Sequence, residues 1–477
     1  MMKKIANKIG CMLFLVLGLQ ACELTEVSNP NITDDNYINT PGATSSWRQG
    51  LQRQLALTLN QVVVGTELVS DNYFNNRTLS SKVFDIPQID YFDLDVDNMQ
   101  RAVHRLREMA DYGLQTILPA DTASTDVDKA DMLFYKAYAH LLAGELFVGL
   151  PIVAKGEVLS PAEHFNLAIT ALKEAASLQS DANEVAAYQL LMARAYYSLG
   201  DKEEASQQAT LAKAHPTLLK QARYDGVNGV SNEMQNYSFS ATNNEFAPLP
   251  RLDFLDPKYY HIGTVSQEQK PISIAKVEEA YLILAEAAIA LGDLANVKKE
   301  LLQLLKVAEQ RPVISIDGSR QTRNGGNRKD YPLVEVSVRF DAETPMQEGY
   351  VLDRRKGNIT VHSVSATKVT SAEIEGATTP NQLLYLLYRM RQEIFFAEGR
   401  RMTDLGIRFP VSQTEKLNNS HVTEQHTKAR IPSFIPGDRG MDDFTYDTQN
   451  GVVTMKYDMN KILVDHQSAS EIFPFLN

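Results

Sequence analysis

Apolar residues recur at spacings of three and four along most of this chain, which is the pattern of amphipathic helices. Leu51, Leu55, Leu59 and Val62 share one face of a helix that the pattern predicts from Trp47 to about Val64. The same periodicity predicts further helices at Asn98–Leu118, Val127–Leu146, Pro161–Ala176, Glu184–Leu199 and Lys202–Ala214. The pattern therefore predicts a mainly α-helical protein.

Some of these helices have the spacing of tetratricopeptide pairs, in which small residues let two helices cross closely and a glycine makes the turn between them. In the first pair these positions are Ala193, Tyr196, Gly200, Ala205, Ala209, Ala212 and Pro216. Ala285, Ala288 and Gly292 repeat the scheme, and a weaker unit joins Met132–Leu150 to Pro161–Leu178. Because the units do not follow one another at a uniform period, we predict a helical-repeat scaffold with long segments inserted between them.

Two insertions interrupt the helical pattern, at residues 224–270 and 311–368. The first is rich in Asn, Gly, Ser, Pro and Tyr, and no helix is predicted there. The second contains stretches typical of short strands in hairpins, at Val334–Phe340, Gly349–Leu352 and Ile359–Val369. Loops on a rigid helical frame are the usual location of binding surfaces.

The clearest helix signal is "TTPNQLLYLLYRMRQEIFFAEGRRMTDLGIRF", near the C-terminus. Thr379 can cap this helix, Pro380 suits its first position, and Gln382 completes a capping box. Arg400 and Asp404 are four residues apart, so we expect them to form a solvent-exposed ion pair on the helix surface.

The first residues have the three parts of a secretory signal. Lysines precede an apolar run at Cys11–Leu19, which is about half of the roughly twenty residues that a membrane-spanning helix needs. The run ends in "LQAC", residues 19–22, which resembles the lipobox of bacterial lipoproteins. That resemblance implies cleavage before Cys22 and attachment of a diacylglyceryl lipid to its thiol. An ordinary signal peptide with a chance cysteine is the alternative.

We therefore expect a lipoprotein signal peptide at 1–21, a flexible polar tether at 22–46, and one domain at 47–477. The sequence contains two cysteines, Cys11 and Cys22, so the mature domain would have neither a free thiol nor a disulfide. Its stability must then come from burial of apolar residues, which make up 44% of the chain.

The chain is acidic, with 59 Asp and Glu residues against 47 Lys and Arg residues and a net charge of −12. Such a surface repels the phosphates of nucleic acids and the headgroups of anionic lipids. We therefore expect no nucleic-acid partner, and we expect the lipid alone to hold the protein at a membrane.

Several motifs resemble the SusD/RagB family of outer-membrane lipoproteins. "EGRRMTDL", Glu398–Leu405, matches the EGxRxxDL signature of the family, and "EAYL", Glu279–Leu282, begins its "EAYL…AEA…GD" helix. "LDPKYY", Leu255–Tyr260, is similar to the DPR segment, with Lys258 in place of arginine. "FVGLPIV", Phe147–Val153, is similar to the fGdvPlv turn, shortened by one residue. With the tether, these motifs cover most of the mature chain in the family's order.

Two features depart from the family pattern. Glu393, the nearest counterpart of a glutamate that normally lies four residues before the EG pair, is one residue further away. The insertion at 311–368 replaces an arginine-rich run. The resemblance therefore implies a SusD-like fold, mainly α with tetratricopeptide-like units, but it leaves the substrate of any subfamily open.

The resemblance implies a cell-surface binding protein of the outer membrane and not an enzyme. Members of the family lie as a lid on a TonB-dependent, SusC-like transporter and trap glycans or peptides for import. The implied partners are that transporter, a glycan or peptide ligand, and the membrane through the lipid on Cys22. The resemblance implies neither a cofactor nor a metal, and it implies a structural role for the EGxRxxDL residues.

Candidate ligand residues lie in two loops that match the family only roughly. One loop combines an aromatic ring with amides and a guanidinium, and the other is aromatic; both suit sugars, and peptide backbones would use the same groups. The residues are Tyr73, Asn75, Asn76, Arg77, Tyr237, Phe239, Tyr259 and Tyr260. The alternative is that these rings seal the loops against the helical core.

Two other functions stay open. A structural lid or scaffold that binds the transporter but no nutrient is consistent with helical repeats, which bind proteins readily. A surface-anchored hydrolase has less support, because the sequence contains no HExxH or GxSxG motif. Its S-x-x-K strings, Ser273–Lys276 and Ser365–Lys368, lack the companion motifs of penicillin-recognising enzymes.

Overall fold

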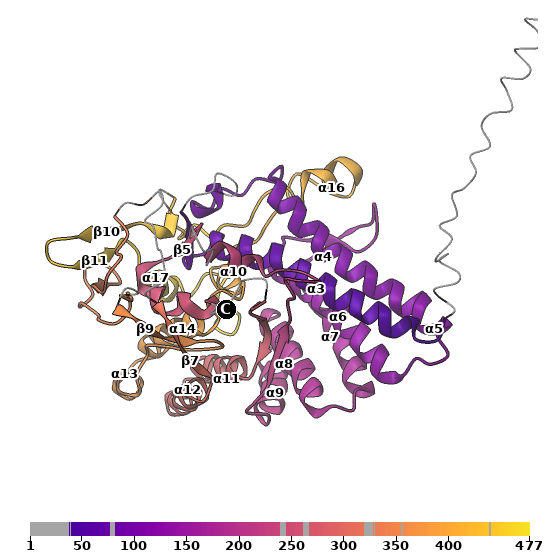
Figure 1. Cartoon of the computed structure of the whole chain (residues 1–477), viewed down its shortest axis with the longest axis horizontal. Coiled ribbons are helices and arrows are strands. Elements are labelled where there is room, and N and C mark those ends of the chain that lie inside the picture. The colour runs from indigo at the N-terminus through magenta and orange to yellow at the C-terminus, as the bar shows by residue number, and fades with distance from the viewer. Residues whose placement is uncertain are drawn as a thin grey trace, which may run out of the picture.

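The computed structural model describes residue 38 and residues 40–76, 82–238, 245–260, 267–318, 328, 330–353, 356–437 and 440–477. The predicted signal peptide, Cys22 and most of the predicted tether lie outside these residues, as do Arg77 and Phe239. Helices dominate the described part of the chain, which confirms the mainly α-helical prediction (Figure 1). In that part, no helix combines the length and the apolar character that crossing a bilayer would require.

The first long helix, α3 (Ala43–Val69), begins before the predicted start at Trp47 and is longer than predicted. Its N-terminus has no cap from the residues just before it. Instead, the carboxylate of Asp121 accepts hydrogen bonds from the backbone N–H groups of Gly42 (3.2 Å) and Thr44 (3.0 Å). A cap supplied by a residue so far along the chain leaves no local sequence signal, and this explains the difference.

The next helix, α4 (Leu94–Tyr112), packs against α3, and Trp47 links the two. The indole Nε1 of Trp47 donates a hydrogen bond to the backbone carbonyl of Met109 (2.9 Å). The chain continues through a π-helical turn at Gly113–Ile117 and the short α5 (Leu118–Ala120). The only tryptophan of the sequence is thus a packing residue between two helices.

Three helix pairs follow one another in space. They are α6 (Asp126–Leu146) with α7 (Pro161–Leu178), α8 (Ala182–Ser198) with α9 (Lys202–Lys213), and α11 (Glu278–Ala290) with α12 (Leu294–Glu309). Helix α7 packs on α8 and α9 packs on α11, so the pairs stack in sequence (Figure 1). The helical-repeat scaffold is therefore confirmed, and its helices begin and end within a few residues of the predicted positions.

A Gly-Asp sequence makes the turn in two of these pairs. Gly200 and Gly292 adopt left-handed backbone conformations, with φ of 76° and 72°, which end one helix without the strain that a Cβ would cause. The aspartate that follows each glycine, Asp201 or Asp293, then caps the next helix through its side chain. One residue therefore stops a helix and its neighbour starts another.

Short antiparallel strands close both insertions at their base. Strand β4 (Leu219–Ala222) pairs with β6 (Ile272–Lys276), so the segment between them leaves and rejoins the scaffold at one point. In the same way β7 (Val313–Asp317) pairs with β9 (Asn358–His362). Because the first insertion returns to its starting point, α9 and α11 can pack together as if the chain were continuous.

The interior of the insertions differs from the prediction in several places. Residues 224–270 contain the helix α10 (Glu233–Ser238) and a 3₁₀ segment, η3 (Pro250–Tyr259), where no helix was predicted. Residues 349–352 are bends and not a strand, and β7 was not predicted. These elements depend on distant partners: β5 (Phe246–Pro248), for example, pairs with β1 (Tyr73–Asn75).

A small mixed sheet joins the second insertion to the C-terminal region. Strand β11 (Val452–Met455) pairs antiparallel with β10 (Phe444–Asp447) and parallel with β8 (Ser337–Arg339), which lies within a predicted strand. Helices α13 (Ser371–Gly376) and α16 (Gln413–Asn418) lie between β8 and β10 in the sequence, and α17 (Met459–Asp465) follows β11.

Helix α14 (Pro380–Ile394) begins as predicted, with the capping box formed between Thr379 and Gln382. It ends earlier than predicted, because Ala397 and Gly399 adopt positive φ angles of 59° and 74° that no helix allows. The chain then resumes as the short α15 (Arg401–Asp404). The signature residues therefore form a sharp turn and not the end of a long helix.

Candidate functional site

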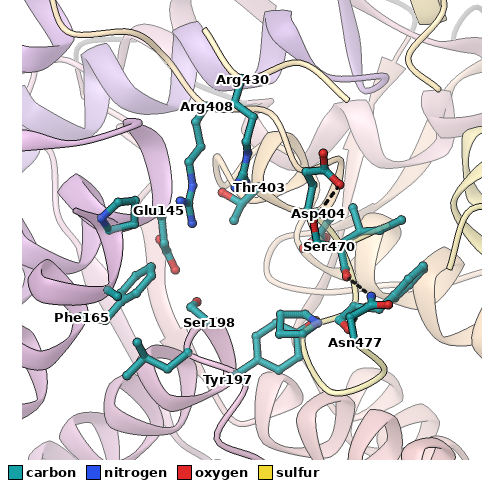
Figure 2. Close-up of a pocket in the computed structure, with 18 of the residues that line it drawn as sticks. Glu145, Phe165, Tyr197, Ser198, Thr403, Asp404, Arg408, Arg430, Ser470 and Asn477 are labelled. Carbon is teal, nitrogen blue, oxygen red and sulfur yellow. Dashed lines mark hydrogen bonds between the residues drawn. The ribbon is translucent and has the colours of Figure 1, made fainter. Parts of the chain in front are cut away.

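A cavity of about 590 Å³ lies where the C-terminal part of the chain meets the helix pairs. Its walls come from α6, the start of α7, the turn after α8, the end of α14, α15, and the segments around residues 408, 430 and 470–477. We call it the arginine cavity, because Arg391, Arg400, Arg408 and Arg430 line it. Figure 2 labels Arg408 and Arg430. Its volume is within the range of small-molecule sites, which is roughly 300–1,000 Å³.

Backbone pairing brings two of these arginines together. Arg408 and Arg430 lie opposite each other in an antiparallel bridge, in which each N–H donates to the other's carbonyl at 2.9 and 3.0 Å. Directly opposed residues of an antiparallel pair present their side chains on the same face. Both side chains therefore enter the cavity from one wall, as Figure 2 shows. The Nε of Arg430 is held by the carbonyl of Gly406 at 2.9 Å.

Arg408 is the least satisfied of the four arginines. Its buried Nε has no hydrogen-bond partner among the residues that the structure describes. Burial and the neighbouring guanidinium of Arg430 lower the pKa of Arg408 to about 9, against the opposing influence of Glu145. At neutral pH the side chain is therefore a positively charged group with unused donors inside the cavity.

The other two arginines are paired. Arg391 donates to Asp404 at 2.7 Å, and Arg400 donates to Glu279 at 2.9 Å. The prediction of an exposed Arg400–Asp404 pair is therefore wrong: each has a different partner, and both are buried. The reason is that α15 is packed in the interior, where Glu279 on α11 and Arg391 on α14 are the nearer partners.

The remaining walls are mixed in character. Phe165 and Tyr197 contribute aromatic rings, Ser198 and Thr403 contribute hydroxyl groups, and Glu145 contributes a buried carboxylate. Figure 2 shows Glu145 and Phe165 on one side and Tyr197 below, with the cavity open between them and the two arginines. Guanidinium forks bind carboxylates through paired hydrogen bonds, while rings and hydroxyls suit a sugar or a peptide.

A buried ionic network supports the cavity. Arg194 on α8 forms a two-pronged pair with Glu279 on α11, at 2.8 and 2.6 Å, and Arg400 binds the same carboxylate. Burial by itself would raise the pKa of Glu279, but the two guanidinium groups outweigh it and lower the pKa to about 2. The carboxylate therefore stays charged and joins three separate segments.

Further buried ion pairs anchor the turn between α14 and α15 to α3, η3 and β6. Arg401 pairs with Asp71 at the end of α3 (2.6 Å), and Glu398 pairs with Lys258 (2.5 Å) and Lys276 (2.8 Å). All of these side chains are buried. The EGxRxxDL residues thus make structural contacts, in agreement with what the family resemblance implies.

The structure places the first predicted ligand loop in the interior. Tyr73 is fully buried, and its ring stacks on Phe396 with 4.8 Å between the ring centres. Asn75 and Asn76 are 4% and 1% exposed, and the backbone N–H of Asn75 donates to the carboxylate of Asp85 at 2.9 Å. These contacts are those of packing residues, and a binding role for this loop stays a prediction.

The residues of the second predicted loop differ in how deeply they are buried. The hydroxyl of buried Tyr259 donates to the carbonyl of Ala397 (2.7 Å), and that of buried Tyr260 donates to Asp256 (3.1 Å). Tyr237 is only partly buried; its ring stacks on Phe246 at 4.6 Å, beside a separate cavity of about 280 Å³. Arg77 and Phe239 lie outside the described residues.

Sequence reasoning missed Arg408, Arg430 and Glu145. Arg408 lies just after the signature, but nothing in the sequence shows that its backbone pairs with Arg430 or that the end of α6 faces both. No His or Cys lines this cavity in the described part of the chain, and no cluster of three metal-binding side chains occurs there.

Replacing Glu279 with glutamine should lower the free energy of unfolding by about 3–5 kcal/mol, because two buried guanidinium groups lose their charged partner. Chemical denaturation measures the change. Glu335→Gln is the matched control, because Glu335 pairs with Lys356 on the exposed surface and should cost about 0–1 kcal/mol. Equal effects of the two substitutions would contradict a structural role for the network.

Glu286 should make stability depend on pH. Burial raises its pKa to about 7, although Tyr197 donates to it at 2.8 Å. A carboxyl group with a raised pKa contributes stability below about pH 4.5, and this contribution is lost as the pH rises through 7. As the pH rises from 5 to 8, the wild type should therefore lose about 3 kcal/mol of unfolding free energy relative to Glu286→Gln, whose side chain does not ionise.

The control for this titration is Glu309→Gln, which removes an exposed carboxylate at the end of α12. Denaturation curves of the wild type and both variants at several pH values measure the change. A difference between Glu286→Gln and the wild type that does not vary with pH would contradict the assignment.

Sequence comparison found no relatives: no protein-family model matches the chain, and no curated protein sequence does. Structure comparison found many. A SusD-like protein from Bacteroides fragilis NCTC 9343 has a TM-score of 0.52 at 12% identity, over 82% of this chain and 98% of that one. A SusD superfamily protein from Bacteroides fragilis has a TM-score of 0.52 at 13% identity, over 81% and 99%.

A third structure, from Bacteroides vulgatus ATCC 8482 and provisionally named a sugar-binding protein, has a TM-score of 0.50 at 14% identity. It covers 81% of this chain and 98% of its own. At such low sequence identity, likeness over nearly the whole length of these proteins shows a shared fold and not a shared function. The resemblance of the motifs to the SusD/RagB family is therefore confirmed at the level of the fold: this chain has the SusD-like fold.

Proposed function

We propose that this protein is a cell-surface lipoprotein that captures a nutrient, a glycan or a peptide, and delivers it to a TonB-dependent outer-membrane transporter. The single domain at 47–477 would do the binding, and the residues before it would be a cleaved signal and a tether. The observation that carries the proposal is the SusD-like fold, combined with a cavity whose walls suit a small polar ligand.

The arginine cavity supports ligand binding over the scaffold alternative. A scaffold that only covered a transporter would gain nothing from a cavity of about 590 Å³ with a guanidinium whose buried Nε has no hydrogen-bond partner in the described part of the chain, because burying such a group without a partner costs stability. The provisional name of the Bacteroides vulgatus structure agrees with a sugar as one ligand class.

The proposed role is binding without catalysis. In the cavity, Asp404 is held by Arg391, and the side chains that line it include none of the His–Ser or His–Cys combinations that activate a nucleophile. Uptake would instead depend on concentration: a binder held beside a pore raises the local concentration of ligand there, and movement of the lid would release it inward.

Lipid attachment at Cys22 would place the protein on the outer membrane. The tether at 22–46 could then span the distance between the membrane and the domain. The acidic composition of the chain disfavours binding to anionic headgroups, so anchoring would depend on the lipid.

The mature protein should bind at least one member of a library of polysaccharides and peptides. An array screen followed by calorimetry measures this, with heat-denatured protein as the control. Absence of binding across both classes would favour the scaffold alternative. Cleavage products found in the same incubations would instead support a hydrolase.

Replacing Cys22 with serine should abolish incorporation of labelled palmitate and release the protein from the outer-membrane fraction, because serine offers no thiol for lipid attachment. Metabolic labelling and cell fractionation measure both effects. Cys11→Ser is the matched control, since Cys11 would leave with the signal peptide. Membrane retention of the Cys22→Ser variant would contradict lipid anchoring at this residue.

A further inference from the structure

The four arginines of the arginine cavity fall into two kinds. Arg391 and Arg400 each donate to a buried carboxylate, at 2.7 and 2.9 Å. Arg430 uses its Nε on the carbonyl of Gly406, and the buried Nε of Arg408 has no hydrogen-bond partner in the described part of the chain. The backbone bridge between Arg408 and Arg430 nevertheless holds both side chains on the cavity wall.

Two neighbouring guanidinium groups without carboxylate partners repel each other and lose hydration, so an anion that bound both would remove an unfavourable interaction. Among the cavity arginines, Arg391 is paired with Asp404 and Arg400 with Glu279. Neither Arg408 nor Arg430 has an ion-pair partner among the residues that the structure describes. Their two positive charges lie in a protein whose net charge is −12.

We infer that the arginine cavity binds the carboxylate of the captured ligand through the guanidinium groups of Arg408 and Arg430. The inference rests on the proposed function and adds the chemical class of its ligand. A carboxylate fits because it carries one negative charge and accepts paired hydrogen bonds from guanidinium forks.

The rest of the ligand would lie against the opposite walls. Phe165 and Tyr197 present rings, while Ser198 and Thr403 present hydroxyl groups, below and beside the arginines (Figure 2). A uronic-acid oligosaccharide and the C-terminal end of a short peptide share the required chemistry: a carboxylate next to polar groups and a face that can contact a ring. The experiment below distinguishes these two sources.

Calorimetry with the mature chain and two matched pairs of probes tests the inference. The first pair is trigalacturonate and its methyl ester; the second is trialanine and its C-terminal amide. In at least one pair the carboxylate form should bind about tenfold or more tightly than its neutral counterpart, because hydrogen bonds to a charged group are stronger.

Arg408→Gln and Arg430→Gln should each weaken binding of that carboxylate about 10-fold to 100-fold. Arg53→Gln, at an exposed position on α3, removes the same charge outside the cavity and should leave binding unchanged. Thermal melting in parallel shows that each variant is folded. If one arginine variant fails to fold, the other still tests the site.

Equal binding of charged and neutral probes, or normal binding by both folded arginine variants, would overturn the inference. So would failure of all four probes to bind the wild type. The proposed function is tested separately, because neutral glycans or peptides found in the library screen would support it whatever the outcome at Arg408.

Discussion

Buried ion pairs around the turn between α14 and α15 hold distant parts of this protein together. Arg401 binds Asp71 at the end of α3, Arg400 binds Glu279 on α11, and Glu398 binds lysines from η3 and β6. A buried charge is expensive unless its partner is present, so each of these groups fixes the position of the other. Several motifs that resemble the SusD/RagB family meet at this one place, although they are far apart in the sequence. The turn itself needs positive φ angles at Ala397 and Gly399, and the network holds the backbone in that conformation.

The arginine cavity follows from the direction in which the chain leaves this turn. Just after α15, Phe409 forms a parallel bridge with Phe147, and its N–H donates to the carbonyl of Leu146 at the end of α6 (2.7 Å). Arg408 is therefore brought to the end of α6, on the side where Glu145 lies. Pairing with Arg430 then fixes the direction of its side chain. The scaffold thus holds two cationic side chains against a wall of helices, in positions where no described residue forms an ion pair with them.

Under the proposed function, this arrangement would separate stability from binding. The charges in the network are paired and buried, whereas the cavity next to it keeps unused donors at a position that a ligand can reach. Two rings from the aromatic loops that the sequence suggested as a ligand surface, Tyr73 and Tyr259, pack against the segment that carries the signature, and a binding role for these loops stays a prediction. The two insertions leave the stacking of the helix pairs intact. Each is closed at its base by a strand pair, which lets the helix pairs stack without interruption.

The sequence by itself determined the helices and their pairing, because these depend on local periodicity, on caps such as Thr379 and on turn glycines such as Gly200. It also indicated the fold, since the signature motifs occur in family order. Tertiary structure decided where the charged residues go: Arg400 binds Glu279 and Asp404 binds Arg391, because packing buries both side chains against partners from other helices. It also decided the short strands, the remote cap of α3 by Asp121 and the meeting of Arg408 with Arg430. Each of these depends on contacts between residues far apart in the chain, for which local spacing carries no signal.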